Sequence, residues 1–338
     1  MANVLLLADM YETGQNNASV PLGLQEWESE KSIVYLKQCI AKLGYQVEVL
    51  EPFTDKKTLL ECLLQYLPLK QETILFNLVE GFASPNRRAW VPALAEFLGF
   101  AYTGSNAALQ ISTLDKQSTS KLVGQLGIPI PKSYLLQERY SLSQVPQSAY
   151  PLFVKPNREG SGMGVDAASI VEGASTLQKK IVQTPKDYFP LLLEALLPGK
   201  EYTVGILGNP GSYQVTKVAH VTYPGSVYGE EVKSKTEMPE RLWFVLEASQ
   251  QQLIQHYALR LANRLQLTGY ARLDFKDDAE GRPHFLEVNL TPGFSRYYSS
   301  FPICYEASFS GGYSEMLAII LRLAMENYRK RPSAYGIR

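Results

Sequence analysis

The sequence predicts an α/β protein that begins with an open parallel sheet covered by helices on both faces. Three short apolar runs of strand length occupy residues 3–8, 46–52 and 73–81. Two segments with apolar residues at helical spacing, residues 29–43 and 59–66, separate these runs. Strand, helix, strand, helix, strand is the order in which such a sheet begins. Later in the chain, predicted strands follow one another without a helix between them.

Composition and charge narrow the class of protein. The chain has 338 residues, enough for two or three domains. Its 45% apolar and 20% charged residues are typical of a soluble globular protein, and its formal net charge of zero gives no sign of a nucleic-acid surface or a polybasic membrane patch. No apolar run approaches the roughly 18 residues of a membrane span. Three widely spaced cysteines indicate reduced thiols rather than disulfides or a zinc site, so we expect a cytoplasmic protein.

The later elements follow from periodicity and turn residues. Ser112 and Asp115 stand at capping-box spacing and introduce a predicted helix at residues 112–127. Further helices are expected at residues 250–266 and 313–328. Strands are expected at residues 152–155 and 165–171. Two more strands, separated by a short connection, are expected within residues 191–207, and a hairpin over residues 269–289 turns at residues 278–281.

A glycine-rich turn joins two of the predicted strands. The stretch "VKPNREGSGMGV", residues 154–165, places Gly160, Gly162 and Gly164 at alternate positions, with Lys155 just upstream. Such turns bring backbone N–H groups close to an anion. A P-loop or a dinucleotide-binding fingerprint would run from a strand into a helix, and in a P-loop the lysine would follow the glycines. Both motifs are therefore excluded, and the turn indicates another kind of anion site.

The predicted hairpin gathers polar side chains on one face. Alternation along its first strand puts Arg272 and Asp274 on the same face, and alternation along its second strand does the same for Glu287 and Asn289. Carboxylate and amide oxygens without Cys or His suit Mg²⁺. A solvated hairpin face is the alternative interpretation of these residues.

Taken together, four segments resemble the ATP-grasp enzymes, and within them the D-alanine–D-alanine ligases. They are "TGSNAALQISTLDKQSTSK" (103–121), "VKPNREGSGMGV", "LLLEALLPGKEYTVGIL" (191–207) and "ARLDF…FLEVNLTPGFS" (271–295). The resemblance extends from about residue 74 to residue 325. It implies an ATP-grasp fold, α+β in its ATP-grasp part, with an N-terminal open-sheet domain (1–104), a central subdomain (105–193) and a C-terminal subdomain (194–338). It also implies an ADP-forming ligase that activates a carboxylate as an acyl phosphate and joins it to an amine.

The same resemblance implies roles for individual residues. Lys116 and Lys155 would contact the α- and β-phosphates, and the turn of Glu159, Gly160, Ser161, Gly162 and Gly164 would close over the triphosphate. Adenine would lie at Glu194 and Leu197, and the ribose hydroxyls at Glu201. A lid at residues 221–241 would bring Lys233 to the γ-phosphate. Asp274, Glu287 and Asn289 would bind two Mg²⁺, with Mn²⁺ as an alternative, and Arg272 and the N–H groups near Gly293 would stabilise the tetrahedral intermediate.

The substrate half departs from the ligases. Ser161 matches a substrate-orienting serine and Glu28 a glutamate, but the lid tyrosine falls at Ser234, and Glu80 stands where the family has histidine. Beyond residue 295 the family's carboxylate-binding pair is replaced; the candidates there are Arg296, Ser299 and Ser300.

We therefore expect another substrate pair: an amino acid with a carboxylate or an enaminone. Non-peptidoglycan dipeptide ligases and the mycosporine-glycine–amino acid ligase are two such enzymes. A genuine D-alanine–D-alanine ligase and an inactive nucleotide-binding regulator are the alternatives, and retention of Arg272, Asp274, Glu287 and Asn289 argues against the regulator. The expected partners are small molecules, with a homodimer as an option, and neither nucleic acid nor membrane.

Overall fold

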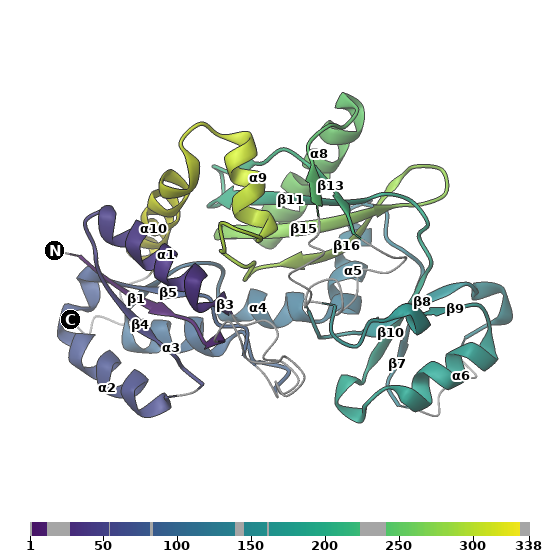
Figure 1. Ribbon diagram of the computed structural model, residues 1–338, viewed down its shortest axis with the longest axis horizontal. Coiled ribbons are helices and arrows are strands. Elements are labelled where there is room, and N and C mark those ends of the chain that lie inside the picture. Colours follow the sequence, from purple (N-terminus) through teal and green to yellow (C-terminus); the bar gives the residue numbers. More distant parts are fainter. Residues whose placement is uncertain are drawn as a thin grey trace.

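A computed structural model describes residues 2–11, 28–53, 55–81, 84–138, 145–160, 162–223 and 241–331. Three main sheets organise the chain (Figure 1), the N-terminal sheet at one end and the central sheet at the other. Within the described part of the chain, no helix is both long and apolar enough to span a membrane. Ser161, Lys233, Ser234 and most of the predicted lid lie outside these residues.

The N-terminal sheet is parallel and has the strand order β4-β1-β5-β6. Alternate residues of β1 point to opposite faces. Val4 and Leu6 pack with α1 and α10, whereas Leu5 and Leu7 pack with α2 and α3. This confirms the predicted open sheet with helices on both faces. The elements are β1 (Asn3–Leu7), β4 (Gln46–Leu50), β5 (Thr73–Asn77), β6 (Ala101–Tyr102), α1 (Glu30–Lys42), α2 (Lys56–Tyr66), α3 (Trp90–Leu98) and α10 (Gly312–Lys330).

The central sheet is antiparallel, with the order β7-β10-β8-β9. Leu177 and Ile181 of α6 (Ala174–Gln183) pack on it. The predicted strand at 165–171 is wrong for most of its length, because a 3₁₀ turn at Ala167–Ser169 leaves only the two residues of β9 to pair with β8. The strands are β7 (Ser133–Leu136), β8 (Leu152–Pro156), β9 (Ile170–Val171) and β10 (Leu191–Ala195).

The third sheet has the order β14-β13-β11-β15-β16, and its pairs are antiparallel. Ile254, Ala258 and Leu261 of α8 (Ala248–Leu265) pack in the same core as its strand residues Val204 and Phe275. The predicted hairpin is confirmed as β15 followed by β16. The strands are β11 (Glu201–Gly208), β12 (Gln214–Val215), which pairs with β11, β13 (Ala219–Thr222), β14 (Arg241–Trp243), β15 (Gly269–Asp277) and β16 (Pro283–Asn289).

One predicted helix needs correction, and one further helix was not predicted. The helix expected at 112–127 is two helices, α4 (Ala107–Leu114) and α5 (Lys116–Gln125). Asp115 is the N-cap of α5 and accepts from the N–H of Ser118, so there is no capping box with Ser112. The segment after residue 295 contains a helix that was not predicted, α9 (Ser300–Ser308), which has a mostly apolar sequence and a buried side. The proposed domain boundaries at 104 and 193 stay predictions.

Candidate active site

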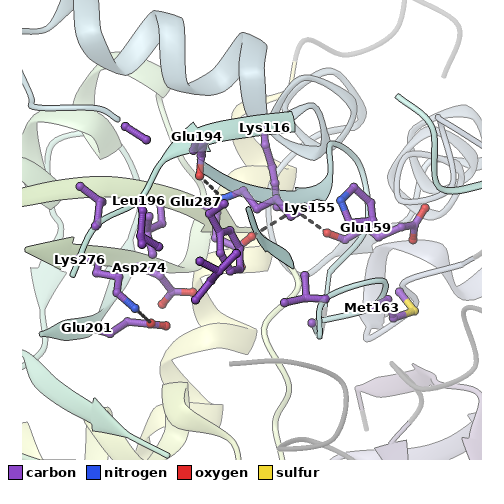
Figure 2. A pocket seen from close by; sticks show the side chains of 18 of the residues that line it. Lys116, Lys155, Glu159, Met163, Glu194, Leu196, Glu201, Asp274, Lys276 and Glu287 are labelled. Carbon is purple, nitrogen blue, oxygen red and sulfur yellow. Dashed lines mark hydrogen bonds and ion pairs between the residues drawn. The ribbon is translucent and has the colours of Figure 1, made fainter. Parts of the chain in front are cut away.

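A cavity of about 280 Å³ lies between the central and third sheets (Figure 2). Strands of both sheets contribute to its walls, and α5 contributes Lys116. The sequence therefore brings distant motifs to one place. Of the residues predicted from sequence, those that line the cavity are Lys116, Lys155, Glu159, Gly162, Glu194, Leu197, Glu201, Arg272, Asp274 and Glu287.

The polar hairpin face forms one wall. Arg272 lies directly opposite Asn289 across the β15–β16 pair, and Asp274 lies opposite Glu287, as the alternation predicted. Arg272 donates to Asp274 over 2.8 Å, and the Thr203 hydroxyl of β11 donates to the same carboxylate over 2.7 Å. Asn289 does not line the cavity; its Oδ1 accepts from the N–H of Thr291.

These oxygens suit Mg²⁺. Among the described residues, no three His, Cys, Asp or Glu side chains converge as a self-sufficient metal centre. Mg²⁺ is usually held by one or two carboxylates together with substrate phosphates. Asp274 and Glu287 match that requirement, and Asn289 lies on the same hairpin face with its Oδ1 already accepting from Thr291. Glu287 also lies 3.2 Å from the Lys116 ammonium, which keeps this wall close to neutral.

The second predicted phosphate lysine sits on the opposite wall. The Lys155 Nζ of β8 lies 2.7 Å from Glu194 Oε2 of β10, and the pair is almost fully buried. The other oxygen of this carboxylate, Glu194 Oε1, is buried without a hydrogen-bond partner. A buried acceptor without a hydrogen bond lowers the stability of the fold. The position of Glu194 Oε1 therefore points to a ligand that brings an N–H donor.

The glycine-rich turn adopts a conformation that needs glycine. Gly162 and Gly164 both have φ near +72°, and a Cβ on Gly164 would lie 2.8 Å from the Pro156 side chain. The turn is also held by Arg87, a buried residue that was not predicted for the site. Arg87 donates to the Arg158 carbonyl over 2.7 Å and to the Glu159 carboxylate over 2.9 Å.

Lys276 and Tyr223 were also missed by sequence reasoning. Lys276 lies 3.2 Å from Glu201 and 3.2 Å from the Tyr223 hydroxyl, and all three residues line the cavity. Burial, more than the nearby Asp274 carboxylate, raises the pKa of Glu201. Lys276 follows Arg272 and Asp274 on the same face of β15, so the alternation contained a signal for it. Tyr223 follows β13 and falls inside the predicted lid at residues 221–241, but it was not singled out there.

Two predicted substrate residues, Glu28 and Ser299, meet at Gly293, shortly after the end of β16. Buried Glu28 accepts from the N–H of Phe294 over 2.8 Å and from the Tyr298 hydroxyl over 3.1 Å. A Cβ on Gly293 would lie 2.7 Å from Ser299 Oγ and 3.0 Å from Glu28 Oε1. Burial raises the pKa of Glu28, and no described residue forms an ion pair with it. A cationic ligand group would remove that penalty.

The remaining predicted residues are placed elsewhere. Glu80 forms a buried ion pair with Arg88. Arg296 pairs with Glu306 over 3.0 Å and donates to the Tyr35 hydroxyl. Ser300 is the buried first residue of α9, and Gly160 accepts through its carbonyl from the N–H of Met163. None of Glu80, Arg296, Ser300 and Gly160 lines the cavity.

Comparison with known proteins places this chain among ligases. The family model "D-ala D-ala ligase C-terminus" matches residues 122–322. The D-alanine–D-alanine ligase of Thermotoga petrophila is 29% identical over 292 residues, 86% of this chain and 90% of that protein. The corresponding enzyme of Thermotoga maritima is 29% identical over 294 residues, with the same coverage.

Solved structures confirm the predicted fold. The D-alanine–D-alanine ligase of Bacillus anthracis complexed with ATP is similar with a TM-score of 0.69 and 20% identity, covering 97% of this chain and 99% of that one. The VanG D-Ala:D-Ser ligase of Enterococcus faecalis is similar with a TM-score of 0.72 and 18% identity, covering 96% and 99%. At these identities the likeness concerns the fold.

Proposed function

The chain belongs to the D-alanine–D-alanine ligase family and is an ATP-grasp ligase, and we propose that it joins the amine of an amino acid to a carboxylate activated by ATP as an acyl phosphate. One observation carries the proposal: a single cavity combines two lysines, a glycine-rich turn and two carboxylates that face each other across a hairpin. Cations and N–H groups suit a triphosphate, and the carboxylates suit its Mg²⁺.

The base of the nucleotide would lie at the Glu194 end. Glu194 Oε1 lacks a donor, and the exocyclic amine of adenine supplies one. Phe153, Ile170 and Leu196 give this part of the lining an apolar surface for the ring. Leu197 would contribute from the same connection between β10 and β11.

The phosphates would lie between the glycine-rich turn and the hairpin. Lys116 and Lys155 would neutralise phosphate charge, and the N–H groups of the turn would hold the phosphate oxygens. Asp274, Glu287 and Asn289 would hold Mg²⁺, which supplies charge neutralisation for phosphoryl transfer. We assign to Lys233 and Ser161 the γ-phosphate and substrate contacts that the resemblance implies.

The amine and the reacting carboxylate would lie near Gly293, four residues beyond the end of β16. Glu28 would bind the ammonium of an amino acid, because its carboxylate is buried without a cation among the described residues. Arg272 and the N–H groups near Gly293 would stabilise the oxyanion formed when the amine attacks the acyl phosphate. A bound lid would exclude water from that intermediate. No covalent protein nucleophile is required.

We propose further that the substrates are not two D-alanines. The segment after residue 295 folds into α9, and Tyr298 of this segment donates to Glu28. Ser299, at 2.7 Å from a Cβ built on Gly293, is the candidate for a substrate carboxylate. Ser234 and Ser300 are second candidates for substrate contacts, whereas Glu80 and Arg296 are already neutralised by Arg88 and Glu306. An enaminone acceptor is one option, and D-alanyl-D-alanine synthesis is the second candidate, favoured by the 29% identical relatives.

Release of ADP tests both the proposed ligase activity and the proposed substrate pair. The protein with ATP and Mg²⁺ would be given D-alanine alone, then pairs drawn from bulkier amino acids, carboxylates and cyclic enaminones. We expect ADP release only when an amine-bearing substrate is present, and higher kcat/KM for a pair other than two D-alanines. No ADP with any pair would contradict the ligase. D-alanyl-D-alanine formed as efficiently as any other product would contradict the specialised substrate.

The metal assignment has its own test. Glu287→Gln removes a charged ligand and should lower kcat by about a hundredfold or more, because Mg²⁺ supplies several kcal/mol of charge stabilisation. The matched control is Glu280→Gln in the exposed hairpin turn, whose carboxylate pairs with Arg282. Near-normal turnover in Glu287→Gln at saturating Mg²⁺ would remove this residue from the metal site.

A further inference from the structure

We propose that Lys276 recognises the sugar of the nucleotide, forming with Glu201 a donor–acceptor pair that reads the two hydroxyls of a ribose. The inference rests on the proposed use of ATP and extends it to a lysine whose role neither the motifs nor the resemblance supplied. Figure 2 shows Lys276 and Glu201 paired in the cavity wall, beside Asp274.

The backbone fixes this pair. Glu201 of β11 and Lys276 of β15 are directly opposite partners in the antiparallel ladder. Lys276 is two residues beyond Asp274 on the cavity face of β15, and Glu201 follows the connection at residues 196–198, whose side chains also line the cavity. The pair thus lies between the proposed base site and the proposed metal wall, where the sugar of a nucleotide must lie.

The hydrogen bonds leave one donor and one acceptor for a ligand. Lys276 Nζ donates to Glu201 Oε2 and to the Tyr223 hydroxyl, each over 3.2 Å, and an ammonium has three N–H groups. The Tyr223 hydroxyl donates to the same Glu201 Oε2 over 3.1 Å. Among the described residues, none donates to Glu201 Oε1. One N–H of Lys276 and one oxygen of Glu201 therefore remain available.

A vicinal diol matches this arrangement. One hydroxyl can donate to Glu201 Oε1 while the oxygen of the other accepts from Lys276, and a deoxyribose loses one of these bonds. If Lys276 and Glu201 served packing alone, two well-packed apolar residues would often stabilise the fold equally well or better. The side chains of Lys276 and Glu201 keep exposed fractions of 21% and 16%, and both line the cavity.

The test compares ATP with 2′-deoxy-ATP and 3′-deoxy-ATP by calorimetric titration. The wild type should bind ATP about fivefold more tightly than at least one deoxynucleotide, as expected for one hydrogen bond. Lys276→Met should lose that preference. Lys276→Gln should keep part of it, because its amide retains an N–H donor. Lys200→Met removes an exposed lysine next to Glu201 and should behave like the wild type.

The outcomes separate the two proposals. A wild type that binds none of the three nucleotides overturns the proposed function and this inference with it. A wild type that binds all three equally overturns the sugar assignment alone, and this result needs no variant. A wild-type preference that persists unchanged in Lys276→Met shows that Lys276 serves only to neutralise Glu201. The ratio of dissociation constants is the readout, because unpairing Glu201 can weaken binding of all three.

Discussion

Lys155 and Glu194 form an ion pair in the cavity wall, so a change of either residue should affect both the free energy of unfolding and the binding of ATP. Their side chains form a 2.7 Å ion pair with exposed fractions of 12% and 4%. A buried pair adds little net stability, but removing one partner leaves a buried charge and costs about 3 kcal/mol or more. We therefore expect Lys155→Met to weaken ATP binding and to lower the free energy of unfolding.

The double variant Lys155→Met/Glu194→Gln separates these effects. Without the charged carboxylate, the loss in unfolding free energy should be smaller than in Lys155→Met, while ATP binding stays weak. Urea unfolding and calorimetric titration measure the two quantities. Wild-type ATP affinity in Lys155→Met would exclude this lysine from the phosphate site.

Glu28 predicts a pH dependence of stability. Burial raises its pKa above the ordinary value of 4.5, although hydrogen bonds from Phe294 and Tyr298 oppose the shift. Below about pH 4.5 the carboxyl is protonated in the folded and unfolded chains alike. As pH rises further, the unfolded chain releases this proton first, so the free energy of unfolding falls until pH passes the raised pKa.

A glutamine at this position carries no such charge. Glu28→Gln should therefore gain stability relative to the wild type as pH rises from 4.5 toward neutrality, and the difference should vanish at lower pH. Urea unfolding at a series of pH values measures it, with Glu280→Gln as the exposed control. A constant difference across this range would show that Glu28 titrates normally. The same variant should also raise the KM of the amine substrate.

At the scale of elements, the glycine-rich turn depends on a residue from the N-terminal third of the chain. Arg87 is buried and makes hydrogen bonds to both Arg158 and Glu159. Charge-assisted bonds of this kind contribute about 1.5–3 kcal/mol each. Arg87→Ala should loosen the turn, raise the KM for ATP about tenfold, and speed hydrogen exchange at residues 162–165.

The exposed Arg322, which pairs with Glu326 on α10, offers a matched control. Arg322→Ala should leave both the KM for ATP and the exchange of the turn unchanged. An Arg87→Ala protein with normal exchange at residues 162–165 would show that the turn is held by its own sequence and by the Lys116 contact to the Glu159 carbonyl.

Local patterns predicted elements and faces, whereas long-range contacts decided the exceptions. Alternation placed Arg272, Asp274, Glu287 and Asn289 on one face because the period of a strand depends on the backbone alone. The break between α4 and α5 was not predictable in this way, since the N–H of Lys116 bonds to the distant Asn157 carbonyl. Tertiary context overrode helical periodicity there.

The site residues divide along the same line. The glycine-rich turn predicted Lys155, strand alternation predicted Arg272, Asp274 and Glu287, and the family resemblance implied Lys116, Glu194 and Glu201; all seven line the cavity. Arg87 was missed because it acts on the turn across 71 residues of sequence. Tyr298 was missed as a partner of Glu28 because the two lie 270 residues apart. Spacing along the chain carries no information about such contacts.

For the whole molecule, the cavity is shared between separately built sheets. Lys155 and Glu194 come from the central sheet, and Asp274 and Glu287 come from the third sheet. Each sheet has its own core, with Val154 and Leu193 in one and Leu273 and Val288 in the other. A nucleotide held by both walls would therefore link two units that otherwise fold around different interiors.

This arrangement predicts that Mg²⁺ and ATP together slow amide hydrogen exchange in both the central sheet and the third sheet. A ligand that binds only the folded site stabilises it by about 2.7 kcal/mol at one hundred times its dissociation constant, which slows exchange through site-destroying openings about a hundredfold. Amides that exchange through opening of β8 (Leu152–Pro156) and of β16 (Pro283–Asn289) should both slow to a similar degree. The N-terminal strand β1 (Asn3–Leu7), which lines no part of the cavity, should slow less and serves as the internal control. Hydrogen exchange with mass spectrometry, with and without Mg²⁺ and ATP, measures all three segments. Slowing of β8 without β16 would mean that ATP is held by the central sheet alone, and the carboxylates of the hairpin would then have no part in binding it.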